Sequence, residues 1–105
     1  MAASLSEATF DEVVAGSDVP VLVEFWAEWC PPCRVLGPVL DSIVAENGNL
    51  ALYKVNSDEE PDLVARFAVS SVPTTLVFKD GALAKRMVGA RGKRHLLEEL
   101  SVVLR

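Results

Sequence analysis

The amino-acid sequence predicts an α/β fold in which helices cover both faces of a central mixed β-sheet. Segments with helical spacing of apolar residues alternate with short apolar segments, which is typical of parallel strands joined by right-handed crossovers. The strand expected over Val21–Trp26 is apolar on both faces except at Glu24, as suits a central strand covered on both sides. Asp80-Gly81 separates two later apolar segments and predicts a hairpin, which adds antiparallel strands.

The first half of the chain is expected to contain helices over 5–15 and 34–47 and strands over 21–26 and 50–55. In the first helix Ser6 is placed to cap the N-terminus, and the run from Gly16 to Pro20 would end it. In the second helix Pro38 removes a hydrogen bond and bends the axis. Asn47-Gly48 is a suitable stop for that helix.

The second half is expected to contain a short helix over 62–67, strands over 74–79 and 83–88, and a closing helix over 93–104. Three acids, Asp58 to Glu60, precede the short helix and suit the positive end of its dipole. Ser70 to Pro73 forms a loop before the first strand of the hairpin. The closing helix is amphipathic, with its apolar residues at Leu96, Leu97, Leu100, Val103 and Leu104.

The only two cysteines of the chain, Cys30 and Cys33, are separated by Pro31 and Pro32. Two intervening residues bring the thiols close enough to bridge as the next helix begins, and proline is tolerated in a first turn. Because a helix N-terminus favours negative charge, Cys30 should be the attacking thiolate. Cys33, one turn further in and more buried, should attack the resulting mixed disulfide and leave a Cys30–Cys33 disulfide.

Two other interpretations of the cysteine pair are a structural disulfide or inert buried thiols, and one half of a metal site. A structural zinc site has four ligands, and His95 is the one further candidate of the usual soft kind. The redox interpretation is favoured, because a Cys-X-X-Cys pair in a βαβ setting is itself a redox signature.

Several motifs together resemble the thioredoxin family: FWAEWCPPC, the proline within the following helix, SVPT and FKDG. The resemblance runs the length of the chain, and it implies the thioredoxin fold and a single domain over residues 1–105. It implies a protein thiol-disulfide oxidoreductase that reduces disulfides in client proteins. It also implies that a thioredoxin reductase using flavin and NADPH re-reduces the Cys30–Cys33 pair, and that the chain holds no cofactor of its own.

The resemblance assigns roles to residues around the cysteine pair. Trp26 and Trp29 match the family's two tryptophans near the active site, and Pro73 matches a proline whose preceding peptide bond is cis. Val72 would then offer backbone hydrogen bonds to an extended substrate, and Gly89 matches a glycine on the substrate-contact surface. The residues expected to bind substrate are Trp29, Pro31, Pro32, Val72, Pro73 and Gly89.

Glu24 is expected to join Cys30 and Cys33 as a catalytic residue. It matches the family's buried acid beneath the cysteines, and Lys54 matches a lysine near that acid. A buried carboxyl is costly unless paired or protonated, so Glu24 is expected to accept the proton of Cys33, through water. The alternative is a carboxylate that reaches solvent or pairs with Lys54.

The chain departs from the family's usual pattern at two positions. Pro31 stands where the commonest active site has glycine, and it removes a backbone donor and flexibility, which bears on redox potential and partner choice. Glu24 stands where the family usually has aspartate. Two further functions therefore stay open: an oxidant, isomerase or specialised donor of the same fold, and a binding subunit that does not need its thiols.

Composition restricts the class of partner. Ten Lys and Arg against 15 Asp and Glu give a net charge of −5, which argues against nucleic acid or an anionic membrane held by electrostatics. No apolar run approaches the roughly 20 residues that span a bilayer, and the start of the chain lacks a signal-peptide pattern. A cytoplasmic monomer is expected.

A basic group occurs late in the chain and consists of Lys85, Arg86, Arg91, Lys93 and Arg94. It is expected to be a solvated face or, alternatively, a docking surface for an acidic partner.

Overall fold

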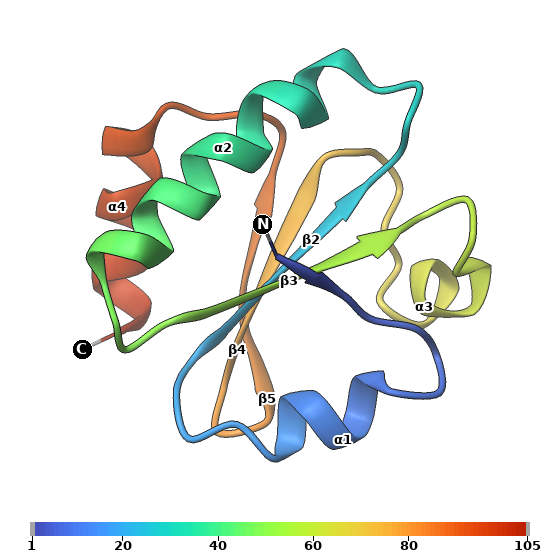
Figure 1. Ribbon diagram of the computed structural model, residues 1–105, viewed down its shortest axis with the longest axis horizontal. Coiled ribbons are helices and arrows are strands. Elements are labelled where there is room, and N and C mark those ends of the chain that lie inside the picture. The colour runs from blue at the N-terminus through green and yellow to red at the C-terminus, as the bar shows by residue number, and fades with distance from the viewer. Residues whose placement is uncertain (1, 105) are drawn as a thin grey trace.

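The fold is a five-stranded mixed sheet with two helices on each face, seen in a computed structural model that describes residues 2–104 (Figure 1). The elements are β1 Ala3–Ser4, α1 Phe10–Ala15, β2 Val21–Trp26, α2 Pro31–Glu46, β3 Ala51–Asn56, α3 Pro61–Arg66, β4 Thr74–Lys79, β5 Ala82–Val88 and α4 Lys93–Val103. The strand order is β1-β3-β2-β4-β5, in which β1, β3 and β2 are parallel to one another and β4 is antiparallel to both of its neighbours, β2 and β5. The predicted fold class is confirmed.

The central strand β2 divides the core into two layers because successive side chains point to opposite faces of a sheet. Val21, Val23 and Phe25 face α1 and α3, where they pack with Phe10 and Leu63. Leu22 faces α2 and α4 and packs in a second cluster with Leu36, Leu40, Ile43, Leu96 and Leu100. Glu24 shares the parity of Leu22, so the alternation turns its carboxyl towards the layer that contains α2.

Several element boundaries differ from the sequence prediction. The two-residue strand β1 was missed, because so short a segment has no periodicity; it pairs in parallel with Tyr53 and Lys54. Helix α1 begins at Phe10 and not at Leu5, and Ser6 is not its cap. The Ser6 carbonyl instead accepts hydrogen bonds from the backbone N–H groups of Thr9 and Phe10 in a turn before the helix.

Helix α2 begins at Pro31, three residues earlier than its predicted body, because Cys30 serves as its N-cap. The helix ends at Glu46, and the side-chain amide of Asn47 donates a hydrogen bond of 2.7 Å to the Ile43 carbonyl. Pro38 lies within α2, as predicted. The predicted hairpin is confirmed as well: Asp80 and Gly81 connect β4 to β5 with φ of 53° and 79°, the left-handed conformation that such a turn requires.

The segments that carry the motifs lie at the same end of the sheet. Strand β2 ends at Trp26, α2 starts at Pro31, and β4 starts directly after Pro73. None of the helices within residues 2–104 combines the length and the apolar character that a bilayer crossing needs.

Candidate active site

Cys30 and Cys33 form a disulfide at the N-terminus of α2, with their Cα atoms 5.4 Å apart. The Cys33 backbone N–H lies 3.3 Å from the Cys30 sulfur and donates a hydrogen bond to it. The sulfur of Cys30 thus occupies the place of a helix-capping acceptor. Both the unpaired N–H groups and the helix dipole stabilise negative charge there, so the geometry favours a thiolate at Cys30 once the disulfide is reduced.

The expected difference in burial between the two cysteines is wrong for the disulfide form. Cys30 is 2% exposed and Cys33 is 5% exposed, so both are buried. They form a small cluster with Ala27, against which Trp26 and Val72 pack. Sequence spacing places Cys33 deeper in the helix than Cys30. It does not show which side chains from other segments cover Cys30. Pro31 and Pro32, between the cysteines, are exposed.

The loop before β4 lies against the cysteine cluster. The Val72–Pro73 peptide bond is cis, as the resemblance implied, and Pro73 is buried. Within residues 2–104 the Val72 backbone makes no hydrogen bond, so its N–H and C=O are free for another chain. The Gly89 N–H donates a 2.8 Å hydrogen bond to the Pro73 carbonyl. Gly89 has φ of 89°, a conformation that glycine adopts without strain. The fold therefore brings Val72, Pro73 and Gly89 together beside the cysteines.

Glu24 is a buried carboxyl without a hydrogen-bond partner among the described residues. It is 1% exposed, and both carboxyl oxygens lack a donor there. Burial raises the pKa of Glu24 to about 7, against an opposing effect of the Lys54 charge and a smaller contribution from Asp41 in the same direction as burial. A carboxyl with this pKa exchanges its proton near neutral pH, which suits a general acid or base.

Lys54 is the direct register partner of Glu24 on β3, yet no ion pair joins them within residues 2–104. The Lys54 ammonium instead lies over the ring of Trp26, 5.1 Å from its centroid. The alternative prediction of a Glu24–Lys54 pair or an exposed Glu24 is therefore wrong. Lys54 acts on Glu24 through its charge alone, and this weak compensation leaves burial as the dominant influence on the carboxyl.

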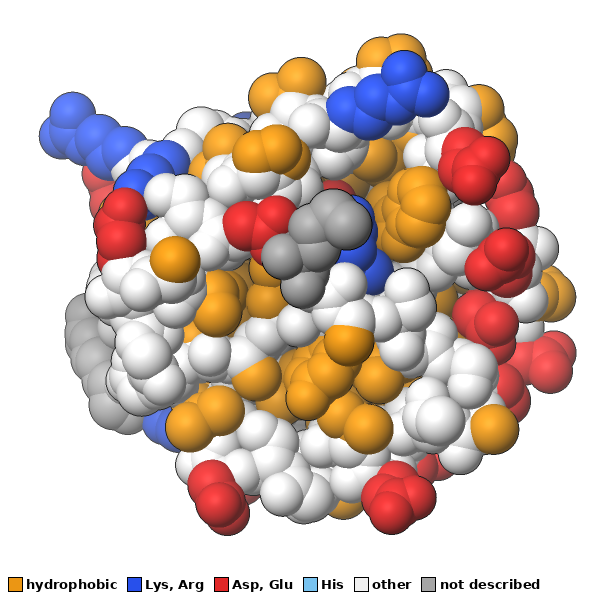
Figure 2. Space-filling model, viewed as in Figure 1, with side chains coloured by type: hydrophobic (Ala, Val, Ile, Leu, Met, Phe, Trp, Pro, Cys, Tyr) orange, Lys and Arg blue, Asp and Glu red, His pale blue; other side chains and the backbone are white. Residues whose placement is uncertain are grey.

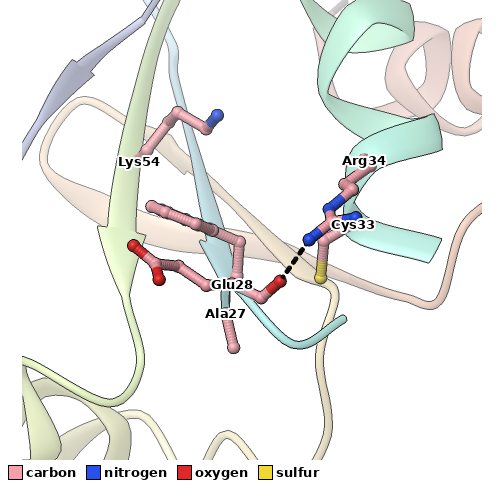
Figure 3. Close-up of a pocket in the computed structure, with 6 residues that line it drawn as sticks. Ala27, Glu28, Cys33, Arg34 and Lys54 are labelled. Atoms are coloured by element: carbon pink, nitrogen blue, oxygen red, sulfur yellow. Dashed lines mark hydrogen bonds between the residues drawn. The ribbon is translucent and has the colours of Figure 1, made fainter. Parts of the chain in front are cut away.

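A pocket of about 310 Å³ reaches Cys33 from the side of Lys54; its lining residues are Trp26, Ala27, Glu28, Cys33, Arg34 and Lys54. Figure 3 shows the Cys33 sulfur and the Arg34 guanidinium on the helix side of this pocket and Lys54 on the strand side. Arg34 Nη2 donates a 2.9 Å hydrogen bond to the Glu28 carbonyl, which joins the start of α2 to the loop that follows β2. Sequence reasoning missed Arg34, because its partner is a backbone carbonyl that leaves no sequence signal.

Trp29 projects from the site and is 68% exposed. Its Nε1 donates a 2.8 Å hydrogen bond to Asp58, which holds the indole over a hollow of about 220 Å³ between Trp29 and Val72. Asp58 was predicted only as an acid before α3, since nothing in the sequence connects it with Trp29. Trp26 is half-buried and packs beside the cysteines, as expected.

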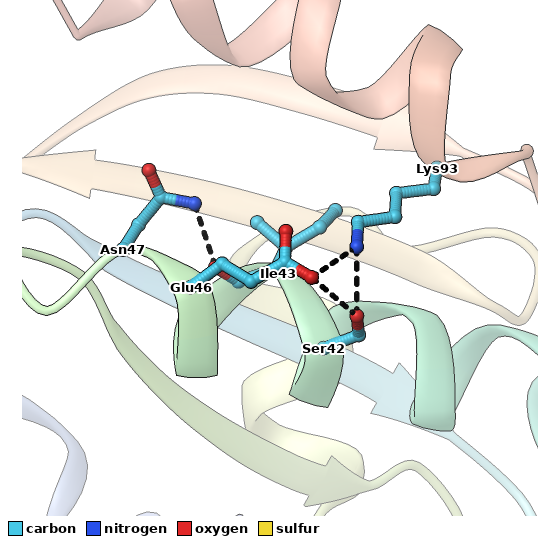
Figure 4. Close-up of polar contacts among 5 residues, drawn as sticks. All are labelled: Ser42, Ile43, Glu46, Asn47 and Lys93. Atoms are coloured by element: carbon cyan, nitrogen blue, oxygen red, sulfur yellow. Dashed lines mark hydrogen bonds and ion pairs between the residues drawn. The ribbon is translucent and has the colours of Figure 1, made fainter.

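Each side chain of the late basic group contacts another group of the same chain. Lys93 contacts Ser42 and Glu46 and so ties α4 to α2 (Figure 4). The remaining members contact Glu99 (Lys85), Glu98 (Arg94), the Phe67 carbonyl (Arg86) and the Val88 carbonyl (Arg91). Exposed acids, in contrast, gather along the edge of the molecule that carries α3 (Figure 2).

His95 was considered above as a further candidate ligand for a structural zinc site. Its side chain is half exposed, and its Nε2 lies 3.2 Å from Glu99 on the same helix. Among the described residues, no three His, Cys, Asp or Glu side chains are placed to hold a metal ion together.

Comparisons with known proteins agree with this site. Residues 1–102 match the family model described as Thioredoxin. The chain is 47% identical over 104 residues to the thioredoxin of Mycolicibacterium smegmatis, with 96% of this chain and 93% of the relative covered. It is 43% identical over 100 residues to thioredoxin 1 of a Nostoc species, with 94% of each covered. It is 44% identical over 101 residues to the bifunctional thioredoxin reductase/thioredoxin of Mycobacterium leprae, with 95% of this chain and 22% of that protein covered.

Proposed function

The chain belongs to the thioredoxin family, and from this premise we propose that it reduces disulfides in client proteins and is itself re-reduced by a thioredoxin reductase. Its activity class is that of a protein-disulfide oxidoreductase. The observation that carries the proposal is the Cys30–Cys33 disulfide at the N-terminus of α2, where a backbone N–H points at the Cys30 sulfur.

In the proposed reaction, Cys30 attacks first. Its thiolate sulfur forms a bond to one sulfur of the client disulfide, and the client's other sulfur leaves and takes up a proton. Cys33 then loses its proton, and its sulfur attacks the Cys30 sulfur of the mixed disulfide. The client's remaining sulfur leaves and is protonated in turn. The client disulfide has gained two electrons and two protons, and the Cys30–Cys33 pair is oxidised.

Glu24 accepts the proton of Cys33 in this scheme. The support is its burial, its pKa of about 7 and the absence of a hydrogen-bond partner among residues 2–104. At neutral pH such a carboxyl is ionised in about half of the molecules, so it can take up a proton and return it to solvent in each cycle.

The client is bound as an extended segment beside the disulfide. The free backbone groups of Val72 pair with it, Pro73 and Gly89 flank it, and the exposed rings of Trp29, Pro31 and Pro32 supply apolar contact. The support is the position of these residues around the cysteine cluster and the unpaired Val72 backbone.

The proposed electron source is a thioredoxin reductase, as is usual in this family. One relative carries the name bifunctional thioredoxin reductase/thioredoxin, so in that protein the two activities share a chain. We further propose that residues 1–105 act as one monomeric domain; Met1 and Arg105 lie outside the described residues. A protein that reduces disulfides needs a compartment in which protein thiols stay reduced, which points to the cytoplasm.

A coupled assay tests this function with NADPH, a bacterial thioredoxin reductase and insulin as the disulfide protein. Addition of the chain should start rapid NADPH oxidation and insulin precipitation, whereas the reductase alone should give neither. A chain that equilibrates with glutathione at a potential no more reducing than the glutathione pool would instead be an oxidant or isomerase, the alternative that Pro31 keeps open.

Trp29→Ala is expected to raise KM for insulin several-fold with little change in kcat, because it removes exposed apolar contact surface and leaves the cysteines in place. Trp29→Phe, which keeps a ring but loses the hydrogen bond to Asp58, should have a smaller effect. Val102→Ala, another exposed apolar residue, is the matched control. Equal KM values for Trp29→Ala and the control would remove Trp29 from the client-binding surface.

A further inference from the structure

Helix α2 presents a glycine to the Glu24 carboxyl. Cys33, Gly37 and Asp41 follow one another at four-residue spacing, so they lie along one face of the helix. The atoms nearest to the position of a Cβ on Gly37, beyond the backbone of its own helix, are Glu24 Oε1 and Lys54 Nζ, each at 3.9 Å. Gly37 therefore stands between Cys33 and Asp41, directly opposite the two register partners Glu24 and Lys54.

The packing against the sheet leaves room for a side chain at this position. A Cβ on Gly37 would lie 3.9 Å from its two neighbours there, which is ordinary van der Waals contact. Within α2, Gly37 precedes Pro38, whose ring crowds a Cβ on the preceding helical residue, so glycine also relieves the local backbone. The missing side chain of Gly37 nevertheless leaves open the space beside Glu24 and Lys54.

That space adjoins groups that need polar contact. Both oxygens of Glu24 lack a hydrogen-bond donor within residues 2–104, and an ionised carboxyl in such a place is costly without water. The charged groups that bear on it are Lys54 from β3 and Asp41 from α2. A methyl group at residue 37 would cover the side of Oε1 and Nζ that faces the helix and would exclude water from it.

We propose that Gly37 is a positioning residue whose missing side chain admits water to Glu24 Oε1 and Lys54 Nζ, and that this water carries the proton from Cys33 to Glu24. This role presupposes the proposed function, in which Glu24 accepts the Cys33 proton. Gly37 touches neither the client nor the sulfur atoms in this scheme, and it acts only through the solvation of Glu24.

The first test follows the Glu24 carboxyl itself, by carbon NMR titration of the oxidised protein. In Gly37→Ala the titration midpoint should rise by about one pH unit, because loss of water penalises the charged form. Gly48→Ala is the matched control, since a Cβ there meets no atom within 4 Å. Gly37→Ser has the same Cβ but adds a hydroxyl that can donate to the carboxylate, so its midpoint should lie below that of Gly37→Ala. An unchanged midpoint in Gly37→Ala would overturn the inference.

The second test follows the rate of insulin reduction between pH 6 and 9. A carboxyl whose pKa moves from about 7 to about 8 is ionised about fivefold less at pH 7. Gly37→Ala should therefore be about fivefold slower at pH 7 and close to the parent at pH 9. In a Glu24→Gln background Gly37→Ala should have no further effect; an equal slowing there would show that the glycine does not act through Glu24.

The two tests separate the inference from the function on which it rests. If Glu24→Gln alone reduced insulin as fast as the parent, the proton-acceptor role of Glu24 would be lost. The carboxyl titration would still decide, without reference to any rate, whether Gly37 controls the solvation of Glu24.

Discussion

Cys30→Ser is expected to abolish insulin reduction in the coupled assay, with a fall of about 10³-fold or more, as is usual when a nucleophile is removed. A serine hydroxyl at the N-terminus of α2 remains protonated at neutral pH and does not attack a disulfide. The fold should persist, because serine is a good N-cap and Cys30 already holds that position. Near-parental turnover by Cys30→Ser would contradict the assigned order of attack.

Cys33→Ser should fail in a different way, because Cys30 still attacks but nothing resolves the product. The variant should accumulate a covalent adduct with the client, visible by mass spectrometry and removed by dithiothreitol. Cys30→Ser is the matched control and should form none. The opposite result, with adducts only in Cys30→Ser, would assign the first attack to Cys33.

The double variant Cys30→Ser, Cys33→Ser addresses the binding-subunit alternative. A thioredoxin-fold binding subunit would keep its biological activity without thiols, whereas an oxidoreductase would lose it. Complementation of a thioredoxin-deficient bacterium by the double variant would therefore show that reduction is not the main function.

Glu24→Gln is expected to change both the rate of reduction and the stability of the fold. The parental rate of the Cys33 step should rise with pH through a midpoint near 7, because the carboxyl must be ionised to accept a proton. The variant should lack this midpoint and be about tenfold slower at pH 7. This loss of rate is smaller than the roughly 10²- to 10⁴-fold that general acid–base catalysis usually contributes, because the Cys33 thiol also loses its proton to solvent.

The same substitution should change how stability depends on pH. The folded pKa of Glu24 is about 7 and the ordinary value is 4.5, so the folded state holds this proton more tightly than the unfolded state. The stability from this group is fully present below pH 4.5 and is lost as pH rises to about 7, by up to about 3 kcal/mol. Glu24→Gln should therefore be more stable than the parent at pH 8.

Urea unfolding at pH 5 and pH 8 measures this difference. Glu12→Gln, which removes an exposed carboxyl from α1, is the control and should keep the parental pH dependence. An equal loss of stability between pH 5 and pH 8 in the parent and in Glu24→Gln would show that Glu24 is not the group responsible.

Much of the fold could be predicted from local patterns, because those patterns are the cause of the local structure. The apolar run of β2, the Asp80-Gly81 turn and the four-residue spacing of α2 each act over a few residues. Apolar periodicity placed the start of α2 late, at Arg34, whereas the cysteine motif placed the helix N-terminus at Cys30, where the structure has it. The strand β1 was missed because its two residues become a strand only by pairing with β3.

For this protein, the sequence by itself determined the chemistry: a Cys-X-X-Cys pair at a helix start, an acid within a buried strand and a proline before β4. Only the tertiary structure decided how these groups act on one another. It buried both cysteines, held Trp29 by Asp58, and placed Gly37 opposite Glu24 and Lys54. The physical reason is that burial and electrostatic coupling depend on contacts between segments far apart in the chain, which no local pattern contains.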